Sequence, residues 1–182
     1  EIDSVIPGGK YHNKKDYMNF PVLNNDLAYD KIEHLVIKDF YKHKTVFKSI
    51  DERDFLVHTP FHKFNHILTF LSEASIDPDV KRICITIYRL SKLSSVANTL
   101  INAAKNGKEV VVQIELQARF DETNNIDYAK LMQDQGVKLI FGIPTLKVHA
   151  KVCVVEKLIK NKNPIFLFLI QENISALSSG KP

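Results

Sequence analysis

The feature that most constrains this chain is a regular alternation of helix-like and strand-like runs between residues 63 and 157. Helices are predicted at 63–75, 94–107 and 124–136, and strands at 54–61, 80–90, 109–120, 137–142 and 147–157. In the strand at 80–90, Ile83, Ile85 and Ile87 share one face. Strands and helices that alternate in this way form an α/β sheet with right-handed crossovers. We expect its functional edge where the strands end.

The composition is that of a soluble globular domain, with 45% hydrophobic and 25% charged residues among 182. The longest apolar run, 164–170, is far too short to span a bilayer, and no signal peptide is expected. Cys84 and Cys153 lie in apolar runs, which favours inert core thiols and a cytoplasmic setting. A net charge of +4 fits a polyanionic partner but does not require one.

His149 and Lys151 are spaced H-x-K on a predicted strand, so their side chains share one face, together with Cys153. A neutral imidazole is a good nucleophile near pH 7, and an adjacent ammonium can hold the phosphate that it attacks. We interpret Cys153 as packing at the edge of such a site. The alternative is a surface strand with two exposed polar residues, because H-x-K alone is not specific.

Charged residues also gather near the predicted ends of two strands. Arg89 and Arg119 lie there, and a guanidinium group binds phosphate oxygens in a bidentate manner. Nearby carboxylates could ligate Mg²⁺, namely those of Glu115, Asp121 and Glu122. Ordinary surface arginines and solvated acidic residues remain the alternatives.

Five blocks of sequence together resemble consecutive blocks of the bacterial polyphosphate kinase family. They run from about residue 4 to about residue 156 and read IPGGKYHNKKDYMNFP, DFLVHTPFHKF, IDPDVKRICITIYRLSKLS, LINAAKNGKEVVVQIELQARFDE and GVKLIFGIPTLKVHAKVCVV. The resemblance implies reversible transfer of the terminal phosphate of ATP to polyphosphate, with Mg²⁺. It also implies a phospholipase-D-like mixed sheet flanked by helices. Family members carry two such domains, each with an H-x-K site.

The resemblance assigns roles to four residues. His149 matches the histidine that becomes phosphorylated, and Lys151 matches a phosphate-binding lysine. Arg89 and Arg119 match residues associated with Mg²⁺ and phosphate. We interpret both arginines as contacting phosphates that hold the metal, because a guanidinium has no acceptor. The implied partners are ATP, ADP and polyphosphate.

The resemblance also predicts the domain organisation. Residues 1–40 resemble the end of the family's helical domain with a linker, and 41–182 the first phospholipase-D-like catalytic domain. Residues 158–182 form an atypical tail without the family's GTGNFN-like motif, which indicates a fragment or a shifted reading frame. The second catalytic domain is missing, so this catalytic domain is expected to be incomplete. The family implies a homo-oligomer, and membrane association of a cytoplasmic protein stays open.

Two other functions remain alternatives. A dimeric phospholipase-D-like phosphodiesterase would carry H-x-K-x-x-x-x-D, and this chain has Glu156 at the last position. A basic module that binds polyphosphate or nucleic acid would also fit the charge.

Overall fold

The computed structural model describes residues 17, 20–30, 32–59, 61–88, 90–91, 93–115, 122–142, 150–158 and 165–170. The chain divides into two compact units, Glu1–Glu33 and His34–Pro182. The first contains a short 3-10 helix, Asn25–Leu27, whose N-terminus is capped by the Asn24 side chain. The second contains the sheet and all the longer helices of the described residues. This division differs from the predicted domains, 1–40 and 41–182, whose correspondence to family domains stays a prediction.

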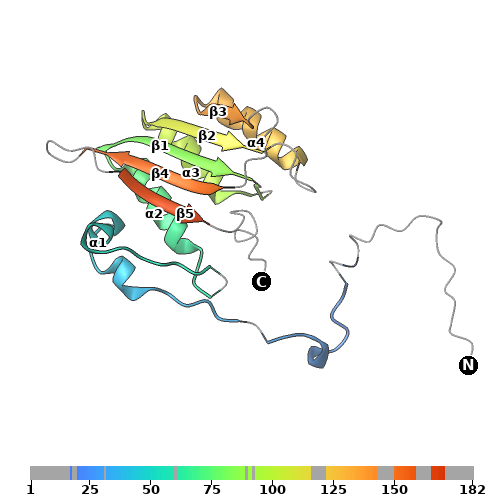
Figure 1. Cartoon of the computed structure of the whole chain (residues 1–182). Coiled ribbons are helices and arrows are strands. Elements are labelled where there is room, and N and C mark those ends of the chain that lie inside the picture. The colour runs from blue at the N-terminus through green and yellow to red at the C-terminus, as the bar shows by residue number, and fades with distance from the viewer. Residues whose placement is uncertain are drawn as a thin grey trace, which may run out of the picture. The chain divides into compact units, whose positions relative to one another are not determined.

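A five-stranded mixed sheet forms the centre of the second unit (Figure 1), with the strand order β3-β2-β1-β4-β5. Strands β1 to β3 are parallel, β4 is antiparallel to β1, and β5 is antiparallel to β4. The bounds are β1 Val80–Ile87, β2 Glu109–Ile114, β3 Lys138–Phe141, β4 Lys151–Lys157 and β5 Ile165–Ile170. The predicted mixed α/β sheet is therefore confirmed.

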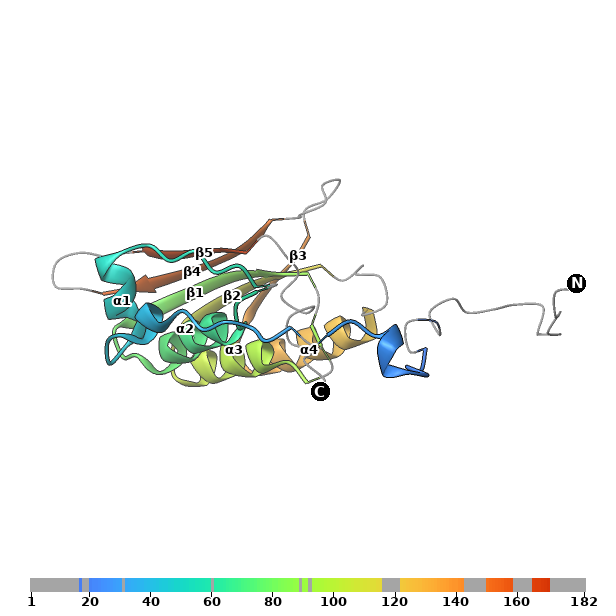
Figure 2. The ribbon, with the colours of Figure 1, turned by 90° about the horizontal axis from the view of Figure 1, so that it is seen from below.

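Helices α2, α3 and α4 lie along the same side of the sheet (Figure 2). The helices are α1 Val46–Glu52, α2 Asn65–Ile76, α3 Ser95–Lys105 and α4 Glu122–Asp134. Helix α3 begins where the Ser94 hydroxyl accepts a hydrogen bond from Ala97 N–H, and Gly107 follows its end with a φ of 78°. Gly136 follows α4 with a φ of 85°. A residue without a Cβ adopts this left-handed conformation at little cost, so both helix ends were predictable.

One apolar cluster fills the space between the sheet and these helices. Ile83, Ile85 and Ile87 are at most 3% exposed, which confirms their predicted common face. Cys153 is buried among them, whereas Cys84 is only partly buried, and both are free thiols. Burial raises the pKa of the Cys153 thiol to about 12, so this sulfur is an unreactive core atom.

The segment before α2 differs from the prediction. Residues 54–59 and 61 are not in a strand, and the described residues of this region form an isolated parallel bridge just beyond the predicted range, between Leu35 and His62. Leu35 N–H donates to Phe61 O at 2.7 Å, and Lys63 N–H donates to Leu35 O at 2.9 Å. A strand is stabilised by a partner segment that pairs with it along its length. Among the described residues, the segment around Leu35 pairs with this region at a single bridge, that to His62.

The His66 side chain, which belongs to α2, connects that helix to the segment around Ile37. This side chain is 0% exposed; Nε2 accepts a hydrogen bond from Ile37 N–H at 3.0 Å, and Nδ1 lies 2.6 Å from Lys63 O. The first bond requires an unprotonated Nε2, so Nδ1 carries the proton and donates to the carbonyl. His66 therefore has a structural role.

No helix among the described residues has both the length and the apolar character to cross a membrane.

Candidate phosphate-binding site at the carboxyl end of the parallel strands

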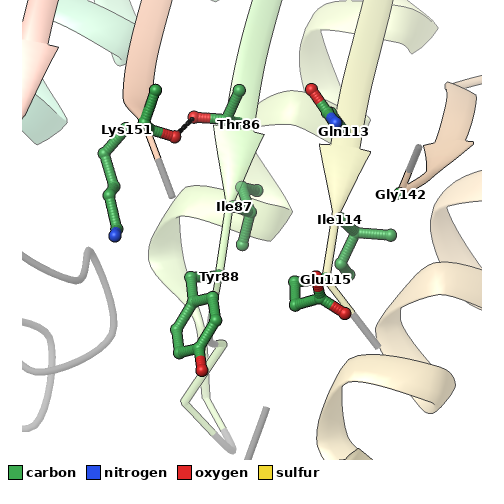
Figure 3. A pocket seen from close by; sticks show the side chains of 9 residues that line it. Thr86, Ile87, Tyr88, Gln113, Ile114, Glu115, Gly142 and Lys151 are labelled. Carbon is green, nitrogen blue, oxygen red and sulfur yellow. Dashed lines mark hydrogen bonds between the residues drawn. The ribbon is translucent and has the colours of Figure 1, made fainter. Parts of the chain in front are cut away.

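A pocket opens where β1 and β2 end and β4 begins (Figure 3). The parallel direction of β1 and β2 brings their carboxyl ends together, and the antiparallel direction of β4 brings its first residue to the same edge. The lining residues are Thr86, Ile87, Tyr88, Gln113, Ile114, Glu115, Gly142, Ala150 and Lys151. Its free space is about 10 Å³, roughly that of one water molecule. The described residues can therefore form the floor of a site for a phosphate-bearing ligand, not an enclosing cavity.

Lys151 is the basic side chain among the described residues that line this pocket. It is only 5% exposed and lies on the buried face of β4, together with Cys153 and Val155. Its Nζ lies 5.4 Å from the centroid of the Tyr88 ring, and Figure 3 shows the Lys151 side chain running from the start of β4 alongside the end of β1, with Tyr88 beyond Ile87. Burial lowers the pKa of the Lys151 ammonium. An ammonium group in a partly desolvated pocket attracts an anion more strongly than one in water, because the local dielectric is lower.

Thr86 holds the backbone at the start of β4. Its hydroxyl donates to Ala150 O at 2.7 Å and accepts from Val152 N–H at 2.8 Å. These two bonds continue the connection between β1 and β4 beyond Ile85 and Cys153, the last backbone pair of the ladder. One hydroxyl therefore fixes the chain on both sides of Lys151.

Thr86→Val tests the role of this hydroxyl, because valine has nearly the same shape and forms no side-chain hydrogen bond. We expect the free energy of unfolding to fall by about 1 kcal/mol, since a carbonyl and an amide lose their partner. The Val152 amide should exchange faster with solvent, as measured by hydrogen exchange. Thr86→Ser keeps the hydroxyl and is the matched control. Unchanged exchange at Val152 in the valine variant would contradict this assignment.

The other predicted site residues, His149, Arg89 and Arg119, lie outside the described residues, as does Asp121. Two of these residues have a described chain neighbour at the pocket: Ala150 follows His149 directly, Tyr88 precedes Arg89, and both line the pocket.

Sequence reasoning did not single out Thr86 or Asn125, which also contacts this edge through its side chain. Thr86 is typical of any strand. Asn125 stands in the run NNID, where nothing local indicates which asparagine is buried.

Among the described residues, no group of three or more histidine, cysteine or acidic side chains could hold a metal. Glu115 is the described carboxylate at the pocket. Mg²⁺ in phosphoryl-transfer sites is bound through one or two carboxylates, substrate phosphates and waters. The described donor set fits that mode of binding and does not fit an all-protein cage.

Comparison with known proteins identifies the class. The family model "Polyphosphate kinase C-terminal domain 1" matches residues 45–176. The chain is 46% identical over 156 residues to a polyphosphate kinase of Vibrio vulnificus strain CMCP6, and 44% identical over 161 residues to one of Escherichia coli K12. These matches cover 85% of this chain and 22% and 23% of the relatives. The chain belongs to the polyphosphate kinase family.

The fold leads to the same family. A crystal structure of polyphosphate kinase from Porphyromonas gingivalis matches with a TM-score of 0.73 and 31% identity, over 93% of this chain and 28% of that one. The chain thus spans about a fifth of the length of the curated relatives it matches. The matched range ends at residue 176, past residue 158 where the sequence resemblance was expected to end. The interpretation of 158–182 as an atypical tail stays a prediction.

Proposed function

We propose that this chain is the first catalytic domain of a polyphosphate kinase, which transfers the terminal phosphate of ATP reversibly to polyphosphate through a phosphohistidine at His149. One observation carries the proposal. The pocket at the carboxyl end of the parallel strands contains the buried Lys151 and is lined by the chain neighbours of His149 and Arg89. Family membership supports the same reaction.

The proposed chemistry needs a neutral imidazole and a set of cations. A ring nitrogen of His149 attacks the terminal phosphorus of ATP, the N–P bond forms, and the P–O bond to ADP breaks. A terminal oxygen of polyphosphate then attacks the phosphohistidine, which restores the imidazole. Lys151, Arg89 and Arg119 hold phosphate oxygens and reduce the repulsion between the two anions. Mg²⁺, when bound through phosphates, would neutralise further charge.

A dimeric phosphodiesterase is less well supported, because its motif ends in aspartate where this chain has Glu156. Glu156 lies near the far end of β4, where its Oε1 is 3.3 Å from an Arg82 guanidinium nitrogen, and it does not line the pocket.

Labelling with ATP tests the proposal. We expect the chain, incubated with γ-labelled ATP and Mg²⁺, to acquire acid-labile label that His149→Ala abolishes. His34→Ala, at an exposed histidine, is the control and should keep the label. Label that persists in His149→Ala would exclude His149 as the nucleophile. Salt-dependent polyphosphate binding without any acid-labile label would instead favour a binding module.

Net synthesis of polyphosphate needs more of the enzyme than labelling of His149 does, so the two assays should give different results with this chain. Positioning and charge neutralisation supply most of the catalysis in phosphoryl transfer, and this chain spans about a fifth of its relatives. We therefore expect little or no polyphosphate synthesis by this chain alone in a turnover assay. Turnover comparable to that of an intact polyphosphate kinase, lost on His149→Ala, would show that the second domain is dispensable.

A further inference from the structure

We propose that Asn125 is a positioning residue for phosphate transfer, because it ties the end of β1 to the end of β2 beside the pocket; the inference rests on the proposed function. Asn125 lies in the first turn of α4 and is 0% exposed. Its Oδ1 accepts a hydrogen bond from Leu90 N–H at 2.9 Å. Its Nδ2 donates to Tyr88 O at 3.0 Å and to Glu115 O at 2.8 Å.

Through these three hydrogen bonds, the Asn125 amide connects helix α4 to the segment that follows β1 and to the end of β2. Tyr88 and Glu115 are the residues that follow β1 and β2, and both line the pocket. Among the described residues, the last backbone hydrogen bond between the two strands is that from Glu115 N–H to Ile87 O at 3.1 Å. Beyond that bond, the described contacts between the two chain segments run through Asn125. The Asn125 side chain thus continues the connection between the two strand ends by one step.

The Asn125 amide also binds the backbone of the segment between β1 and α3. Tyr88 and Leu90 flank Arg89 in the sequence, and Asn125 bonds the carbonyl of the first and the amide of the second. Further along the same segment, Ser94 N–H donates to the Tyr128 hydroxyl of α4 at 2.9 Å. Helix α4 therefore holds the connection between β1 and α3 at two points. The Asn125 amide therefore fixes the backbone of the two residues that flank Arg89 in the sequence.

The chemistry of asparagine suits this task. An amide offers donors and acceptors in one rigid plane, so it can accept from one backbone group while it donates to two others. A buried backbone group that loses its partner is costly, so the loops would rearrange if the amide were removed. A displacement of about 1 Å at a phosphate-binding group is enough to reduce transfer strongly. Asn125 touches no reacting atom in this scheme and acts through the two loops.

Asn125→Leu tests the proposal, because leucine has a similar branched shape and no hydrogen-bonding group. We expect the Leu90 amide to exchange about tenfold faster with solvent, with the Ile85 amide in β1 unchanged. We also expect affinity for polyphosphate, measured by calorimetry with the 182-residue chain, to fall about tenfold. Asp127→Leu places the same leucine at an exposed position of α4 and should leave both values unchanged.

Each result decides the proposal. Faster exchange at Leu90 with unchanged affinity would make Asn125 purely structural and overturn it, as would unchanged exchange at Leu90. If Asn125→Leu loses protection throughout the strands, Asn125→Asp replaces it; this variant keeps the acceptor for Leu90 and loses both donors. Unchanged affinity in Asn125→Asp overturns the proposal. A wild-type chain that binds no polyphosphate would overturn the proposed function, and Leu90 exchange would still report whether Asn125 ties the two strand ends.

Discussion

Replacing Lys151 with methionine should weaken polyphosphate binding by about 10- to 100-fold, because a charge-assisted hydrogen bond contributes about 1.5–3 kcal/mol. Methionine fills a similar volume and keeps an unbranched chain, so packing should change little. Calorimetric titration with polyphosphate measures the effect. Lys81→Met removes the same charge from an exposed position on β1 and is the control. Equal loss of affinity in both variants would show that net charge, not the pocket, holds the ligand.

The same variant should not lower stability. Burial lowers the pKa of Lys151 from its ordinary value of 10.5, so folding is opposed while the ammonium stays charged. This cost is fully present below the lowered pKa of the folded state. It diminishes as pH rises toward 10.5, since the unfolded chain then binds more protons than the folded one. Above 10.5 the amine is neutral in both states.

The change in the free energy of unfolding caused by Lys151→Met therefore has an expected sign and pH dependence, which urea unfolding can measure. Its free energy of unfolding should equal or exceed that of the wild type at pH 7, and the difference should shrink as pH approaches 10.5. Loss of affinity without loss of stability distinguishes a ligand-binding lysine from a structural one. A clear loss of stability at pH 7 would make Lys151 a structural residue.

Phe40→Ala should have the largest effect on stability, about 3–5 kcal/mol. The Phe40 ring is 1% exposed and packs edge-on, at centroid distances of 5.3 Å, against Tyr41, Phe55 and His66. Truncation would leave a cavity among rings held by several separate segments, which can close only partly. Chemical denaturation of the variant and the wild type measures the difference.

The result bears on where the unit that contains the sheet begins. Phe40 lies in the segment predicted to end the helical domain, yet it belongs to the apolar cluster of the unit that starts at His34. Phe20→Ala is the control, because its ring is 63% exposed and should contribute little. An effect of Phe40→Ala below about 1 kcal/mol would place residues 34–41 outside the cooperative core.

Local patterns account for the elements that sequence analysis predicted well. The helix predicted at 63–75 is α2, Asn65–Ile76, and the strand predicted at 80–90 is β1, Val80–Ile87. Their apolar spacing is a property of consecutive residues. The prediction of a strand at 54–61 was wrong, because a strand also depends on a partner segment. Among the described residues, Leu35 forms a single bridge next to this range, to His62.

The sequence by itself determined the family and the order of strands and helices from α2 to β4, but it predicted neither α1 nor β5. The shared face of His149 and Lys151 stays a prediction, because His149 lies outside the described residues. The sequence could not show that Lys151 is buried beside Tyr88, 63 positions earlier in the chain, or that Asn125 bonds both Tyr88 and Glu115. Those contacts exist because β4 runs antiparallel to β1 while β2 runs parallel to it, so that two strand ends and one strand start meet at one edge. Strand order and direction follow from the packing of the whole core, which no local stretch of sequence specifies.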